Sequence, residues 1–93
     1  MREKNYYICL LSSKNYVIQI IYILENLGYT KFDIISTPYE IRRGCDYAIK
    51  FKKIEDLQII MKETNKLNME IKDVYKIERI NGEKTIKKIK YFI

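Results

Sequence analysis

The chain has 93 residues, of which 47% are hydrophobic and 32% charged, which predicts one small globular domain rather than two. Two cysteines and no histidine exclude a Ser-His-Asp triad, a Cys-His pair and a four-thiolate zinc site within this chain, and argue against a self-sufficient enzyme. The formal net charge of +6 suits an acidic partner. However, Lys, Ile, Asn and Tyr are abundant together, as AT-rich coding DNA would produce, and we favour that explanation of the charge.

No apolar run approaches the ~20 residues of a membrane-spanning helix. The charged start is followed by a short apolar stretch that ends at Leu11 without a small-residue cleavage site. We therefore expect a cytoplasmic protein that does not enter a membrane.

Residues 6–11 form a nearly continuous apolar run, which predicts a buried central strand. Ser12 or Ser13 is suited to cap the helix that follows. The apolar side chains of that helix recur every three or four residues and predict a core-facing stripe: Tyr16, Val17, Ile20, Ile21, Leu24 and Leu27. Gly28 is expected to end the helix, because glycine readily adopts the left-handed conformation found there.

The next elements follow in a similar pattern. Residues 32–36 predict a second strand, which Thr37-Pro38 ends because proline cannot donate to a sheet. After a loop over 37–45, residues 47–51 predict a third strand, and the spacing of apolar residues over 54–67 predicts a second helix. Residues 69–77 predict a fourth strand, with Ile71, Asp73, Tyr75 and Ile77 alternating.

The element order βαββαβ predicts an α+β ferredoxin-like sandwich, an antiparallel sheet with two helices on one face. We expect a single domain over 1–93, with a core over 5–77 and a C-terminal β-hairpin extension over 78–93. The hairpin is indicated by Asn81-Gly82, a strong two-residue turn signal. Simple pairing across this turn places Lys76 opposite Lys87, an unfavourable contact that a bulge, a shifted register or a second subunit would relieve.

The loop before the third strand is the main candidate site. Pro38 stiffens its entrance, and Gly44 permits a positive φ or the close approach of another molecule beside Cys45. Arg42 and Arg43 add positive charge, which favours a nucleophilic thiolate, and the backbone N–H of Gly44 could contribute to an anion-binding nest. The alternative is that Cys45 is a small apolar side chain that plugs the start of the strand.

The stretch from 37 to 51 resembles the signature of the selenium/sulfur carrier protein-like family, and the resemblance extends over about 5–77. That pattern reads Thr-Pro-Arg-Glu-Ile, small residues, Cys-Gly, and a strand with alanine between apolar residues. The matching positions are Thr37, Pro38, Glu40, Ile41, Cys45, Ala48 and Ile49, and Gly44 fits a small-residue slot. The departures are Tyr39 in place of arginine, Arg42 and Arg43 in place of serine-like residues, and Asp46 in place of glycine.

The resemblance implies a carrier role, without a metal or organic cofactor, between sulfur or selenium donor and acceptor proteins. The Cys45 thiolate would attack the terminal sulfur of a donor persulfide. Arg42, Arg43 and the Gly44 backbone would hold the anionic cargo, and Thr37 and Pro38 would shape the loop.

Other interpretations remain open at this point. Cys9 is expected to be a core residue, although a reversible Cys9–Cys45 disulfide is possible if the two strands are neighbours. A nucleic-acid-binding module would use aromatic residues such as Tyr47 and Phe51, which share a strand face. A protein-interaction module would instead pair through an edge strand, for example as a homodimer.

Overall fold

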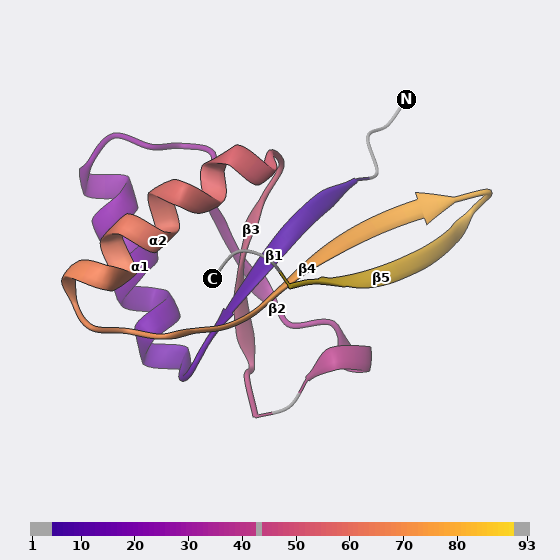
Figure 1. The fold of residues 1–93 in the computed structure, drawn as a ribbon, viewed down its shortest axis with the longest axis horizontal. Coiled ribbons are helices and arrows are strands. Elements are labelled where there is room, and N and C mark those ends of the chain that lie inside the picture. The colour runs from indigo at the N-terminus through magenta and orange to yellow at the C-terminus, as the bar shows by residue number, and fades with distance from the viewer. Residues whose placement is uncertain (1–4, 43, 91–93) are drawn as a thin grey trace.

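The computed structural model describes residues 5–42 and 44–90, in which two helices cover one face of a five-stranded antiparallel sheet (Figure 1). The strands are β1 (Tyr6–Leu11), β2 (Asp33–Ser36), β3 (Tyr47–Phe51), β4 (Ile71–Ile80) and β5 (Glu83–Ile89). The helices are α1 (Lys14–Asn26) and α2 (Leu57–Lys66), with two 3-10 turns, η1 (Tyr39–Ile41) and η2 (Ile54–Asp56). The predicted elements are therefore present, with small shifts at their ends.

The strands lie in the order β2-β3-β1-β4-β5. β1 is central and pairs antiparallel with both β3 and β4, as expected for the first and third strands. β5 pairs with the free edge of β4, which confirms that the C-terminal segment adds a fifth strand. The β4–β5 hairpin extends away from the helices in Figure 1.

Both helices end in the same local structure. Ser13 caps α1 by accepting a hydrogen bond from the Tyr16 N–H at 3.2 Å, and Gly28 ends it with φ +95°. The Tyr29 N–H then donates to the Leu24 carbonyl, which satisfies a free C-terminal oxygen. Asn68 takes the corresponding position after α2 with φ +56°, a role for asparagine that the sequence analysis missed.

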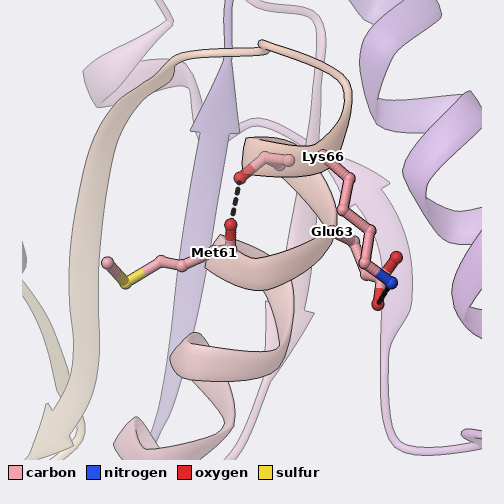
Figure 2. Close-up of polar contacts among 4 residues, drawn as sticks. Met61, Glu63 and Lys66 are labelled. Carbon is pink, nitrogen blue, oxygen red and sulfur yellow. Dashed lines mark hydrogen bonds and ion pairs between the residues drawn. The ribbon is translucent and has the colours of Figure 1, made fainter.

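The buried polar groups of α2 are also paired. The Thr64 hydroxyl donates to the Met61 carbonyl at 3.1 Å, and the ammonium of Lys66 lies 3.4 Å from the carboxylate of the buried Glu63 (Figure 2). These contacts offset the cost of burying the polar atoms of Glu63 and Thr64.

A β-bulge interrupts β4 near its start. Leu10 lies opposite Asp73 and Leu11 opposite Ile71, so Lys72 has no counterpart on β1. The predicted alternation of Ile71, Asp73, Tyr75 and Ile77 on one face was therefore wrong. Ile71 packs on the helix-covered side with Val74, whereas Tyr75 and Ile77 pack on the other side.

The hairpin keeps the register that its turn predicts. Asn81 and Gly82 adopt φ values of +54° and +83°, as a tight two-residue turn requires. Lys76 lies opposite Lys87, with no shift or bulge between them. The Glu78 carboxylate lies 3.2 Å from the Lys76 ammonium, which offsets the repulsion between the two lysines.

The sheet has a buried apolar cluster on each face. The helix-side cluster includes Cys9, Leu11, Ile49, Phe51 and Val74 from the sheet and Val17, Ile20, Leu24, Leu57 and Ile60 from the helical segments. The loop-side cluster consists of Ile8, Leu10, Ile41, Cys45, Ala48 and Ile77. Since no helix covers this second face in the described part of the chain, its burial depends on the segment between β2 and β3.

Candidate functional site

The segment from Thr37 to Asp46, here called the signature loop, covers the sheet face opposite the helices (Figure 1). Its two ends are joined by a hydrogen bond of 3.0 Å from the Thr37 N–H to the Asp46 carbonyl. Within the loop, the Ile41 N–H donates to the Pro38 carbonyl at 3.1 Å and closes the η1 turn. This turn directs Ile41 into the loop-side cluster.

Cys45 lies beneath this cover, with 2% of its surface exposed. Its Sγ donates a hydrogen bond to the Leu11 carbonyl at 3.3 Å, at the end of the central strand. The Lys72 Nζ donates to the same sulfur at 3.8 Å. The thiol is thus packed against apolar side chains, with a carbonyl on one side and an ammonium group on another.

A family model described as Putative Se/S carrier protein-like matches residues 6–76. The chain belongs to this family. The comparisons found no curated protein and no solved structure that matches the chain. The match includes the signature loop, Cys45 and Lys72, and ends within β4, so β5 lies beyond it.

In this member of the Se/S carrier protein-like family, the sequence predicted the surroundings of Cys45 only in part. Gly44 has φ +82°, and a Cβ built on it would have no heavy atom within 4 Å, so glycine is needed there for its conformation and not for space. Arg42 is exposed, and its backbone N–H donates to the Tyr39 carbonyl at 3.4 Å. Arg43 lies outside the described residues.

Lys72 is the site residue that sequence reasoning missed. It lies 27 positions from Cys45, and the β4 bulge allows it to reach the loop-covered face. One signal was visible in the sequence of this Se/S carrier-like chain. Val74 interrupts the alternation of apolar residues, and such a break is what a bulge produces.

Cys9 is the second thiol and lies on the opposite face of the sheet, in the helix-side cluster. It is fully buried, which confirms its expected place in the core. Burial raises the pKa of the Cys9 thiol. Both cysteines are free, and their side chains belong to clusters on opposite faces, so the alternative of a Cys9–Cys45 disulfide was wrong for this structure.

The aromatic pair considered for nucleic-acid binding does not form an exposed platform. Phe51 is buried beneath the helices, where its ring stacks on Tyr7 with the centroids 5.6 Å apart. Tyr47 alone of the two has a substantial exposed surface.

Neither helix of the described chain is long and apolar enough to cross a bilayer.

Proposed function

We propose that this protein carries sulfur or selenium on Cys45, as a persulfide or selenide, from a donor protein to an acceptor protein. The observation that carries the proposal is that the cysteine of the family-matched loop has its Sγ at the start of a strand beneath a loop cover. That sulfur has a hydrogen bond to a backbone carbonyl and no covalent partner.

The transfer step is a displacement at sulfur. The Cys45 thiolate attacks the outer sulfur of a donor persulfide, a new S–S bond forms to Cys45, and the donor's S–S bond breaks. The donor leaves as a thiolate, which takes up the proton that Cys45 released, so one persulfide and one thiol give one persulfide and one thiol. Transfer to the acceptor repeats this exchange with Cys45 as the donor.

The burial of Cys45 makes a loop movement part of this cycle, because an in-line attack needs a free approach to Sγ. The cover consists of Ile41 and its turn, the hydrogen bond between Thr37 and Asp46, and an ion pair of 3.7 Å between Glu40 and Lys84. The described contacts of this cover include one buried apolar side chain and no α-helix, and loops open at a lower free energy than a core does. We infer that a partner protein reaches Cys45 when the signature loop opens.

Arg42, Arg43 and the Gly44 N–H are the proposed anion-holding groups of the open loop. Gly44 supports this role through its positive φ, a conformation that recurs where successive N–H groups form an anion-binding nest. Thr37 and Pro38 have the proposed loop-shaping role, through the hydrogen bonds at the loop ends and at the η1 turn.

We also propose that residues 5–77 form a ferredoxin-like core to which β5 is added. The support is the order β2-β3-β1-β4 with antiparallel neighbours, and two helices that each connect strands not adjacent in the sheet. This proposal concerns the fold alone and adds nothing to the carrier role.

The test compares two single variants of the reduced protein after incubation with a low-molecular-weight persulfide. Cys45→Ser keeps a hydroxyl that can donate to the Leu11 carbonyl, and Cys9→Ala avoids burying an unpaired hydroxyl in the helix-side cluster. Intact-mass measurement should show the gain of one sulfur atom in the wild type and in Cys9→Ala, and none in Cys45→Ser. A gain that persists in Cys45→Ser would refute the carrier role of this residue.

A further inference from the structure

We propose that Lys72 is a positioning residue of the cysteine site, whose ammonium group balances the negative charge of the Cys45 thiolate and of the persulfide it carries. The inference rests on the proposed function and deepens it. It adds a strand residue to the loop groups that are proposed to hold the anion.

The backbone geometry of β4 brings Lys72 to the sulfur. In a regular strand, Lys72 would share the helix-covered face with Val74, because side chains alternate. The bulge places Ile71 on that face instead. The Lys72 Nζ lies 3.8 Å from the Sγ of Cys45, which belongs to the loop-side cluster on the opposite face. Bulges of this kind often redirect a side chain beside a functional site.

The other groups described around the sulfur are acceptors or apolar. The Leu11 carbonyl, 3.3 Å from Sγ, accepts a hydrogen bond from the thiol and has no proton to donate to an anionic sulfur. Ile41, Ala48 and Ile77 of the same cluster offer no polar atom in their side chains to stabilise an anion. The Lys72 ammonium, 3.8 Å from Sγ, supplies a charged donor at this point, and such a donor pairs with an anionic sulfur.

The signature loop has no net formal charge of its own. In its sequence, the two arginines are matched in number by Glu40 and Asp46. Lys72 adds a positive charge from outside the loop. Its place on β4 is independent of the charges that the loop itself contains.

The experiment measures the rate at which iodoacetamide, a neutral probe, alkylates Cys45 at neutral pH in the full chain. Lys72→Met should lower this rate about five- to tenfold, the scale of a typical net hydrogen bond, and Lys72→Arg should restore most of it. The matched control is Lys88→Met. Lys88 is paired at 3.2 Å with Asp73, the neighbour of Lys72, so this variant removes a cation from the same region. Its rate should stay within about twofold of the wild type.

Thermal unfolding of each variant separates a charge effect from a loss of structure. A Lys72→Met rate equal to that of the wild type, or a Lys88→Met rate as low as that of Lys72→Met, would overturn the role of Lys72. The role of Lys72 would also be overturned if the Lys72→Arg protein were as stable as the wild type but did not regain its alkylation rate. The alkylation rate does not depend on persulfide loading. If Cys45 never gains sulfur, the proposed carrier function is wrong. The effect of Lys72 on the Cys45 alkylation rate is still tested, because that measurement needs no persulfide.

Discussion

The two faces of the sheet each bury one cysteine, and they differ in what covers it. Cys9 has 0% of its surface exposed and Cys45 has 2%, so burial alone does not distinguish them. Cys9 lies beneath α1 and α2, whose side chains interlock with the sheet. Cys45 lies beneath a loop that contains a single 3-10 turn. From this difference we expect access to each buried thiol to depend on the free energy needed to remove its cover, and not on its static exposure.

The largest expected effect comes from truncating the helical cover. Ile20 is fully buried in the helix-side cluster, so Ile20→Ala should lower the free energy of unfolding by about 2–5 kcal/mol. The alkylation rate of Cys9 should rise in proportion to the equilibrium constant for unfolding, because we expect Cys9 to become accessible only on global unfolding. The rate of Cys45 should not change, since the loop opens without the helices. Denaturant unfolding and peptide mapping of alkylated protein measure both quantities, and a parallel rise at the two cysteines would contradict the comparison.

Truncating the loop cover should have the complementary result. Ile41→Ala removes the buried side chain that η1 contributes to the loop-side cluster, at a cost of about 2 kcal/mol. The same peptide mapping should show Cys45 alkylation accelerated by up to about 30-fold, because each 1.4 kcal/mol is a factor of ten. An unchanged Cys45 rate would show that the loop is not what excludes the probe.

The pH dependence of stability should distinguish the helix-covered thiol. The folded-state pKa of Cys9 is raised by burial, so its contribution to stability is complete below the unfolded-state pKa of ~8.5 and is lost as pH rises above it. The loss approaches about 1.4 kcal/mol per pH unit. Chemical denaturation at several alkaline pH values measures the unfolding free energy of the wild type and of Cys9→Ala. The difference between the two free energies should fall with pH at this slope. An identical alkaline loss in both proteins would contradict it.

Two glycines offer a matched pair for the loop. Gly44 and Gly82 have φ values of +82° and +83°, and an added Cβ at either would meet no heavy atom within 4 Å. Alanine should therefore cost about 1–2 kcal/mol at both sites, for conformational reasons alone. Gly44→Ala should also accelerate alkylation of Cys45, whereas Gly82→Ala, in the hairpin turn, should not. Equal Cys45 alkylation rates in the two variants would show that the backbone conformation at Gly44 does not control access to the thiol, and would contradict this prediction.

The smallest effect is expected from the ion pair that joins the loop to β5. Glu40 and Lys84 are 3.7 Å apart and partly exposed, so the pair should contribute at most about 1 kcal/mol. Lys84→Met should raise the Cys45 alkylation rate no more than about fivefold, and added salt should reduce the difference from the wild type. An effect that persists undiminished at high salt would point to packing by the Lys84 stem rather than to charge.

The features predicted from the sequence are those that neighbouring residues determine. The spacing of apolar residues located α1, and Ser13 and Gly28 marked its ends, because caps depend on local hydrogen bonds. Asn81-Gly82 determined the hairpin and its register. The burial of Cys45 was only one of two alternatives that the sequence offered, and the contact between Lys72 and Cys45 was not predicted, because both depend on packing between distant segments.

The most direct test of the account is the denaturant dependence of alkylation at both cysteines of the folded wild-type protein. We predict that Cys45 reacts faster than Cys9 and at a rate nearly independent of low urea concentrations, since loop opening exposes little surface. The rate at Cys9 should rise with urea as steeply as global unfolding does. Equal rates with the same urea dependence at the two cysteines would show that both thiols become accessible by the same unfolding, and would contradict the account.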